Sequence, residues 1–462
     1  MTRAYAHFIG VGGAGMSGIA RVLHDRGVVI TGSDLRSSRY STALQNAGMT
    51  VHIGHDAANV GDPEVVVVST AIPRTNPELV EARRRDIPVW PRARMLAELA
   101  GERLTVAVAG THGKTTTSSM AAAALIEAGA DPTFLIGGEL TDVGSNARCG
   151  DGPHFVVEAD ESDGSFLYLD PYCAIVTNIE ADHLDHYGSL EEIVDIFREF
   201  LSRVHVDGVA VLCADDDRLM TLAPKVPARV VTYGRADTAD VRLTSYAATA
   251  DGGAFTVALP DGTTVSCSTR IPGVHMALNA TGVLAAAWAL GIDVESAARG
   301  IASFGGVKRR FEHVGVIGDV SVVDDYAHHP TEVRATLAAA RTATAGARWV
   351  VFQPHRYSRT AAFARDFGAA FDDADHVVIL DVYSAGEAPV PGVSGKTVVD
   401  AILRHRPRTR LAYFPHRGDV AQYVADRARP GDLVMTMGAG DVTALGPEIV
   451  RALTGRATGG AA

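Results

Sequence analysis

The chain has 462 residues, of which 47% are hydrophobic and 21% charged, and its formal net charge is −12. This length exceeds a single ordinary core and indicates about three domains. The negative charge argues against sequence-independent binding to nucleic acid or to an anionic membrane, both of which require a positive surface. No charged and apolar leader and no bilayer-spanning apolar run is found, so we expect a cytoplasmic protein without membrane insertion.

Residues 1–98 alternate strand and helix signals, which is typical of a parallel sheet that binds its ligand at the carboxyl ends of the strands. The stretch YAHFIGVGGAGMSGIA at 5–20 joins a short apolar strand to a glycine loop of the pattern G-x-G-x-x-G. Asp34 ends the next strand, where a dinucleotide ribose would bind. On its own, this fingerprint predicts a nicotinamide-dependent oxidoreductase.

Two further regions follow, predicted as 99–312 and 313–462. In the first, LTVAVAG, FVVEADES, CAIVTNI and VAVLCADDD indicate a parallel nucleotide-binding sheet, and an Asp-Gly turn at 261–262 indicates an antiparallel appendage. In the second, SVVDDYA, RWVVFQPHR, HVVILDVYSA, RLAYFP and DLVMTMGAG alternate with helices and indicate another α/β domain. The fold class is therefore α/β, with three mainly parallel sheets. The tail at 454–462 is expected to be disordered.

A second phosphate-binding pattern occurs in VAVAGTHGKTTTSS, where a strand and a glycine turn precede Lys114 and Thr115. Backbone amides at a helix start face phosphates, the ammonium neutralises their outer oxygens, and a Thr hydroxyl can bind Mg²⁺. The pattern departs from the usual loop because Val108 stands at the first consensus glycine. Lys114 is also the only lysine among the first 224 residues, which favours the phosphate role. GVSGKT at 392–397 follows no apolar strand, so we interpret it as a surface turn.

Acidic and histidine residues follow the next two strands of this region. Glu158 ends FVVEADESD, and Asp182 and His183 follow CAIVTNI. Because parallel strands end at one edge of a sheet, Thr115, Glu158 and His183 are predicted to share Mg²⁺ beside ATP phosphates. Two phosphate-binding folds in one chain favour a ligase, with one fold for a phosphate-bearing substrate and one for ATP.

The ordered motifs of the chain resemble the Mur ligases over essentially its whole length. These motifs are GVGGAGMSGIA, GSD, STAIPRTNPE, AGTHGKTTT, GGELTDVGSNA, EADESD, TNIEADHLDHY, VKRRFE, DDYAHHPTE, QPHRYSRT and GAGD. The resemblance is greatest to the alanine-adding branch, and IVDIFREFL lacks the lysine that several other branches carry. It implies an ATP-dependent ligase that adds L-alanine to the lactyl carboxylate of UDP-N-acetylmuramate through an acyl phosphate, in peptidoglycan precursor synthesis.

The resemblance also implies a ligand or a catalytic role for particular residues. The UDP-sugar would be bound by Gly10, Gly12, Gly13, Gly15, Asp34 and Ser69. ATP would be bound by Gly110, Thr111, His112, Gly113, Lys114, Thr115, Thr116, Asn279, Arg310 and Asp325. The incoming alanine would be bound by Tyr326, His328, Arg356 and Arg359. Lys114, Glu158, His183 and Arg310 would be catalytic, and Thr115, Glu158 and His183 would hold Mg²⁺.

Several alternatives stay open at this point. Arg356 and Arg359 could clamp a carboxylate with forked donors or could form a solvated basic loop. The pair His328 and His329 could form a transition-metal site, although adjacent histidines rarely chelate one ion. A cell-wall recycling ligase that joins a tripeptide to the same sugar nucleotide would share most motifs. Met276 stands where relatives often carry asparagine, which puts one ATP contact in doubt.

Overall fold

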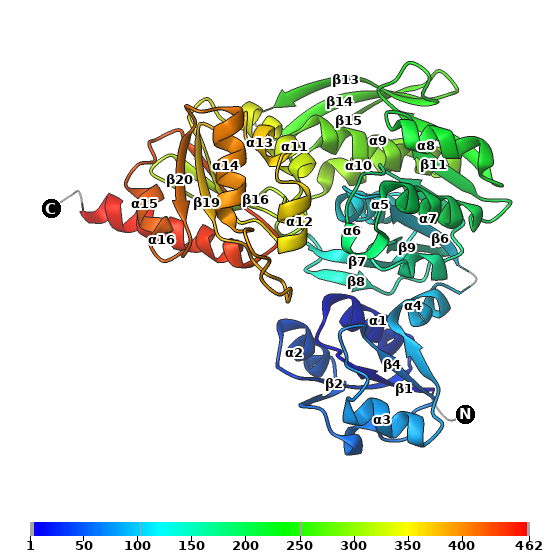
Figure 1. Ribbon diagram of the computed structural model, residues 1–462. Helices are drawn as coiled ribbons and strands as arrows, with labels where there is room; N and C mark the ends of the chain where they lie inside the picture. Colours follow the sequence, from blue (N-terminus) through cyan, green and yellow to red (C-terminus); the bar gives the residue numbers. More distant parts are fainter. Residues whose placement is uncertain (1–3, 102, 250–251, 460–462) are drawn as a thin grey trace.

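The computed structural model describes residues 4–101, 103–249 and 252–459. Three mainly parallel sheets follow one another along the chain, which confirms the expected three-domain α/β fold. Figure 1 shows the N-terminal sheet at the bottom, the central sheet at the upper right and the C-terminal sheet at the left. Within the described ranges, no helix is long and apolar enough to cross a membrane. The domain boundaries after residues 98 and 312 stay predictions.

The N-terminal sheet has five parallel strands in the order β3-β2-β1-β4-β5. The strands are β1 (Tyr5–Ile9), β2 (Val29–Asp34), β3 (Thr50–Ile53), β4 (Val65–Val68) and β5 (Val89–Pro91). The helices are α1 (Ala14–Asp25), α2 (Arg39–Asn46), α3 (Pro77–Arg84) and α4 (Arg92–Ala100), with a 3-10 turn at Ala57–Val60. The glycine loop joins β1 to α1, as the sequence predicts.

The central sheet has ten strands in the order β15-β14-β13-β12-β11-β10-β6-β9-β7-β8. Neighbours from β13 to β7 are parallel, whereas β14 and β15 at one edge and β8 at the other are antiparallel. The predicted appendage is therefore present, and Gly262 in its turn has a φ of +86°. The strands are β6 (Leu104–Ala109), β7 (Thr133–Leu140), β8 (Ser145–Arg148), β9 (His154–Glu158), β10 (Cys173–Val176), β11 (Val209–Cys213), β12 (Arg229–Gly234), β13 (Val241–Thr249), β14 (Gly252–Ala258) and β15 (Thr264–Thr269).

Helix α5 (Lys114–Glu127) lies inside the central domain, against the sheet and helices α9 and α10. Ten of its fourteen residues are buried, and most of them are Ala, Ser or Thr, which lets neighbours approach closely. A Cβ added to Gly300 of α10 would lie 2.5 Å from the carbonyl oxygen of Ala123. This packing holds α5 closely against its neighbours. The other helices are α6 (Leu184–Tyr187), α7 (Leu190–Ser202), α8 (Asp217–Leu222), α9 (Val274–Ala289) and α10 (Val294–Ser303).

The C-terminal sheet has the order β16-β17-β21-β18-β19-β20, with β16 antiparallel and the others parallel. Its strands are β16 (Glu312–Ile317), β17 (Val320–Asp325), β18 (Arg348–Phe352), β19 (His376–Leu380), β20 (Arg410–Phe414) and β21 (Leu433–Met437). Its helices are α11 (Pro330–Ala343), α12 (Tyr357–Ala362), α13 (Phe367–Ala370), α14 (Gly395–His405), α15 (Val420–Ala425) and α16 (Leu445–Gly459).

Two local expectations need correction. GVSGKT begins as the expected exposed turn at Gly392, but its second half starts a helix, because Ser394 caps α14 in a capping box and Asp381 Oδ1 accepts the N–H of Gly395 at 2.8 Å. The tail expected to be disordered continues α16 through residues 454–459, and residues 460–462 lie outside the described residues.

The first domain is attached to the central domain through α1. This helix packs against strands β7 and β8, and Asn146 Nδ2 of β8 donates to the carbonyl oxygen of Ala14 at 3.0 Å. A Cβ at Gly18 of α1 would lie 2.6 Å from Leu135 Cδ2 of β7. The β7–β8 edge of the central sheet is therefore the surface on which the first domain packs.

Candidate active site

The phosphate loop, residues 110–116, connects β6 to α5. Gly110 has a φ of +131°, and a Cβ there would lie 2.1 Å from Thr177 Oγ1. Gly113 has a φ of +85° and directly precedes the helix. Since α5 begins at Lys114, its first turn leaves backbone N–H groups without helical acceptors, the usual binding site of phosphate. The loop therefore has the predicted conformation.

Lys114 is held by a buried carboxylate that the sequence did not single out. Its Nζ lies 2.8 Å from Glu161 Oε1 and 2.7 Å from Glu161 Oε2, and it donates to the carbonyl oxygen of Gly110 at 2.8 Å. The side chain of Glu161 is only 2% exposed. Burial, opposed by the Lys114 ammonium, raises the pKa of the Glu161 carboxyl to about 7. The lysine is thus positioned at the loop by an acid from the segment after β9.

Thr115, Glu158 and His183 converge as predicted. Thr115 Oγ1 donates to Glu158 Oε1 at 3.1 Å, and the N–H of Gly137 donates to Glu158 Oε2 at 2.9 Å. Burial raises the pKa of Glu158 and lowers that of His183. All three residues line one large cavity of about 470 Å³. The set offers a hydroxyl, a carboxylate and a neutral imidazole, which together fit a divalent cation.

The large cavity is lined by residues of all three domains. Arg39 and Tyr40 come from α2, the phosphate loop comes from the central domain, and His355 and Arg356 come from the C-terminal domain. Sequence reasoning missed Arg39 and Tyr40, because they belong to an ordinary helix start without a motif. Each of the residues predicted to bind alanine, Tyr326, His328, Arg356 and Arg359, also lines this cavity.

A buried ion pair joins the central and C-terminal domains beside the cavity. Arg359 donates to Asp182 Oδ1 from Nη2 at 2.8 Å and from Nε at 3.1 Å, and both side chains are at most 7% exposed. Burial opposes the charge of Asp182, but the guanidinium of Arg359 holds its pKa well below the usual range. The fork of Arg359 is thus directed at Asp182, and the two-arginine clamp for a substrate carboxylate stays a prediction.

A small cavity of about 240 Å³ adjoins the large one and contains the predicted adenosine-contacting residues. Asn279 and Asp325 line it, and so does Met276. The carboxylate of Asp325 accepts the backbone N–H groups of Phe311 and Ala327, both at 2.8 Å. Burial, opposed by Arg310, raises its pKa to about 6. Asp325 therefore orders the junction between the domains, and its contact with adenosine stays a prediction.

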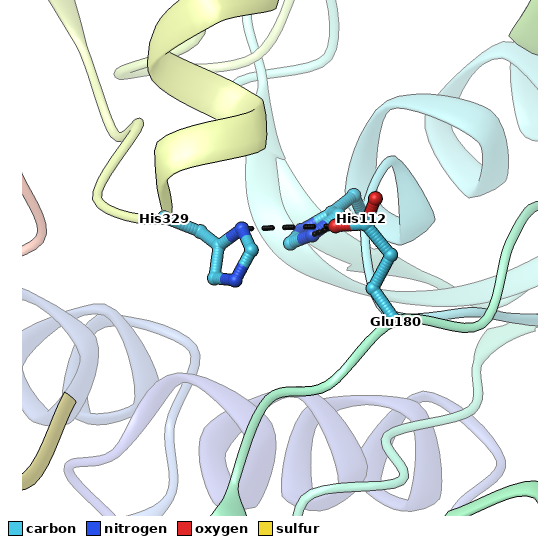
Figure 2. A group of neighbouring side chains, drawn as sticks. All are labelled: His112, Glu180 and His329. Atoms are coloured by element: carbon cyan, nitrogen blue, oxygen red, sulfur yellow. Dashed lines mark hydrogen bonds and ion pairs between the residues drawn. The ribbon is translucent and has the colours of Figure 1, made fainter. Parts of the chain in front are cut away.

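His112 stands between two carboxylates where the phosphate loop meets the C-terminal domain. Its Nε2 lies 3.1 Å from Glu180 Oε2 and its Nδ1 lies 3.4 Å from Glu332 Oε1. Burial opposes its charge, but these carboxylates raise the pKa of His112 to about 9. Figure 2 shows the His329 ring facing both His112 and Glu180, with its Nδ1 3.8 Å from Glu180 Oε2.

Within the described ranges, His112, Glu180 and His329 are the one group of three histidine, cysteine or acidic residues whose ligand atoms lie close enough for a metal ion. Both nitrogens of His112 face carboxylates, and His329 Nδ1 accepts the N–H of Thr331 at 3.3 Å as the cap of α11. The rings of His328 and His329 have different neighbours, Tyr326 and Phe363 respectively. The adjacent histidines therefore do not present a shared transition-metal site.

Strained backbone positions gather at the two cavities. The described residues include eight non-glycine residues with positive φ, and four of them line a cavity. Such conformations are costly and persist where the surrounding structure fixes them, commonly at functional sites. The four are His183, Arg309, Phe311 and Arg356.

The N-terminal glycine loop forms a separate site. Gly10 has a φ of +82°, and Gly12 donates its N–H to Asp34 Oδ2 at 2.8 Å. A Cβ at Gly10 would lie 3.4 Å from Ser69 Cβ. Gly10, Gly12, Asp34 and Ser69 are therefore close together at the carboxyl ends of β1, β2 and β4, as the sequence predicts. None of them, nor Gly13 or Gly15, lines the two cavities described above.

This fold and this site define a three-domain nucleotide-dependent enzyme. Residues 5–103 match the Mur ligase family catalytic domain, 108–287 the Mur ligase middle domain, and 309–440 the Mur ligase glutamate ligase domain. The chain belongs to the Mur ligase family, which confirms the resemblance seen in its sequence.

Individual relatives cover nearly the whole chain. A UDP-N-acetylmuramate--L-alanine ligase of Mycobacterium ulcerans (strain Agy99) is 50% identical over 468 residues, which cover 98% of this chain and 95% of the relative. The crystal structure of a UDP-N-acetylmuramate-alanine ligase from Thermotoga maritima is similar with a TM-score of 0.81 at 28% identity, over 98% and 99% of the two chains. The crystal structure of a murein peptide ligase from Psychrobacter arcticus is similar with a TM-score of 0.70 at 27% identity, over 97% of this chain and 98% of that one.

Proposed function

We propose that the protein is an ATP-dependent ligase that joins the amino group of L-alanine to the lactyl carboxylate of UDP-N-acetylmuramate in peptidoglycan precursor synthesis. The observation that carries this proposal is the large cavity, in which the phosphate loop, the cation-binding set and the basic C-terminal pocket face one another. A phosphate donor, a carboxylate acceptor and an amino acid can meet there. The expected cytoplasmic location accords with this role and stays a prediction.

The reaction proceeds in two steps in this proposal. The substrate carboxylate attacks the γ-phosphorus of ATP, which releases ADP and gives an acyl phosphate. The alanine amine then attacks the acyl carbon and displaces phosphate, and the amine loses a proton. Each step needs charge stabilisation and positioning more than covalent help from the protein.

Lys114 and Arg310 supply the positive charge that the transferring phosphoryl group requires. Both line the large cavity, and Lys114 begins the helix whose amide groups face the same space. Thr115, Glu158 and His183 would hold Mg²⁺, which supplies further neutralisation of phosphate charge when bound. Burial lowers the pKa of His183 and lowers that of His328 to about 4. Either ring could accept the amine proton.

Exclusion of water matters because an acyl phosphate is readily hydrolysed. The Asp182–Arg359 pair and the contacts of His112 with Glu332 join the central and C-terminal domains around the cavity. These contacts hold the two domains together beside the residues predicted to bind alanine. The closed arrangement therefore supports acyl transfer to an amine rather than to water.

The recycling ligase that joins a tripeptide to the same sugar is the second candidate. Its support is weaker, because the murein peptide ligase structure is similar at a TM-score of 0.70 against 0.81 for the alanine ligase structure. The first glycine loop alone suggested an oxidoreductase, but the three matched domains are those of ligases and do not support that function.

ATP turnover with UDP-N-acetylmuramate and Mg²⁺, measured as phosphate release with each amino acid in separate wells, tests the proposal. Alanine should stimulate release above every other amino acid. Release with L-alanyl-γ-D-glutamyl peptides but not with alanine would establish the recycling reaction instead. No stimulation by either would overturn the ligase assignment.

A further inference from the structure

Four residues line both cavities and form the wall between them. They are His112, Gly113, Arg310 and Glu332. His112 and Gly113 belong to the phosphate loop, and Arg310 lies at the junction between domains. Glu332 differs from them because it belongs to α11 and carries a negative charge between two sites that bind anions. The presence of an acidic side chain between two anion sites therefore calls for a physical explanation.

The two oxygens of Glu332 have different partners. Oε1 lies 3.4 Å from His112 Nδ1 and 3.9 Å from Arg310 Nη1, and both of these residues are predicted to bind ATP. Oε2 accepts the backbone N–H groups of His328 at 3.0 Å and His329 at 3.2 Å, and it lies 3.4 Å from His328 Nδ1. One planar carboxylate thus holds the phosphate loop with one atom and the alanine-binding segment with the other.

The charge of Glu332 is secured by its neighbours. Burial opposes ionisation, yet the cations around it hold its pKa well below the usual range. The side chain is 13% exposed, so little water competes for its oxygens. A carboxylate with little access to water couples its partners, because a contact that is lost on either side leaves a largely buried polar group unsatisfied.

We propose that Glu332 is a positioning residue that couples the phosphate loop to the alanine pocket. When ATP displaces the loop or Arg310, the carboxylate plane turns with them and moves the backbone of His328 into its alanine-binding position. This inference rests on the proposed function, since it assigns the coupling between the two substrates of that reaction.

The simpler explanation is that Glu332 only caps its helix, as the third residue of a capping box with His329. A cap requires a single accepting oxygen, which a glutamine supplies equally well. The variant Glu332→Gln keeps that oxygen and places an NH₂ group toward His112 and Arg310, where an acceptor is needed. The variant therefore retains the cap of α11 and removes the contacts of Glu332 with His112 and Arg310, the two residues predicted to bind ATP.

The matched control is Glu180→Gln. Glu180 contacts the opposite nitrogen of His112 at 3.1 Å and lies 3.8 Å from the ring nitrogen Nδ1 of His329, but it is not among the residues that touch Arg310 or His328 in the described structure. It disturbs the same histidine without breaking the bridge through Glu332. KM for ATP and KM for alanine are measured for each variant by phosphate release at saturating UDP-N-acetylmuramate, with melting temperatures as a check on folding.

Glu332→Gln should raise both KM values by about tenfold, whereas Glu180→Gln should raise only that for ATP. His112→Gln should raise KM for alanine in the wild-type background but not further in the Glu332→Gln background. A normal KM for alanine in His112→Gln would overturn the proposal, even if Glu332→Gln failed to fold. Equal effects of His112→Gln in both backgrounds would also overturn it. Failure of the wild type to use alanine would instead refute the proposed function.

Discussion

Lys114 Nζ and Glu161 Oε2 lie 2.7 Å apart in an almost solvent-free pair at the start of α5. The same ammonium is the group expected to bind the outer phosphates of ATP, so carboxylate and nucleotide compete for it. Glu161→Gln should therefore bind a non-hydrolysable ATP analogue more tightly, by about fivefold, or roughly 1 kcal/mol. Turnover should fall because the lysine is no longer held in place.

Isothermal titration with the analogue and steady-state phosphate release measure these two effects. Glu161→Asp, which keeps the charge, should preserve the wild-type affinity. Weaker binding by Glu161→Gln would show that the acid supports nucleotide binding directly rather than competing with it.

Lys114→Ala should lower kcat by about 10³-fold or more, because removal of a preorganised charge from a phosphoryl-transfer site has effects of this size. Binding of UDP-N-acetylmuramate should be largely retained, since the glycine loop lies in the first domain. Phosphate release measures kcat, and calorimetric titration with UDP-N-acetylmuramate measures its binding. Lys396→Ala is the control, because Lys396 pairs with Asp400 at 2.6 Å on the exposed face of α14. Loss of UDP-sugar binding in Lys114→Ala would mean that the nucleotide sites have been exchanged.

Asp182→Asn should destabilise the junction of the central and C-terminal domains by about 3 kcal/mol, because it leaves the buried guanidinium of Arg359 without a counter-charge. We also expect a higher KM for alanine, since Arg359 lines the same cavity. Thermal melting and limited proteolysis at the junction follow the first effect. Asp195→Asn, which breaks an exposed pair with Arg198, should change neither measurement. An unchanged melting temperature for Asp182→Asn would contradict the inferred role of the pair.

The contacts of His112 should weaken at alkaline pH. Its pKa is about 9 in the folded protein against about 6.5 in an unfolded chain. A histidine whose pKa is raised by folding stabilises the folded state fully below pH 6.5, and this stabilisation is lost as the pH rises through 9. The difference between the two pKa values sets the largest contribution to the free energy of unfolding at about 3 kcal/mol. Melting temperatures of the wild type and His112→Gln, compared from pH 6 to 10, should converge at the alkaline end. A constant difference over that range would exclude a protonated His112.

The sequence predicted the parts of the site that follow directly from chain order. Strand ends and glycine turns determine where Lys114 and Glu158 lie, because a parallel sheet brings its carboxyl ends to one edge. Glu180 and Glu332 were not predicted, since each acquires its role from partners on another element. Glu332 is 220 positions from His112 in the chain, and only domain packing brings the two within 3.4 Å.

Contacts that form only on folding likewise explain the first two of the remaining differences, whereas the third has a local sequence signal. Arg359 was expected to face a substrate carboxylate, but Asp182, 177 positions away, occupies its fork in the structure. Strand β16 was not predicted, because its half-exposed sequence EHVGVI carries little apolar signal before it pairs with β17. Ser394 was not recognised as a helix cap, although a Ser before GKTVVDAIL is a usual start signal.

The β7–β8 strand pair has a mechanical consequence. Its Asn146 binds the first turn of α1, and its Gly137 binds the carboxylate of Glu158. Rotation of the first domain about α1 would pull on the same strands that hold Glu158, the acid predicted to bind the cation. The orientation of the first domain and the position of Glu158 are therefore mechanically linked through one pair of strands.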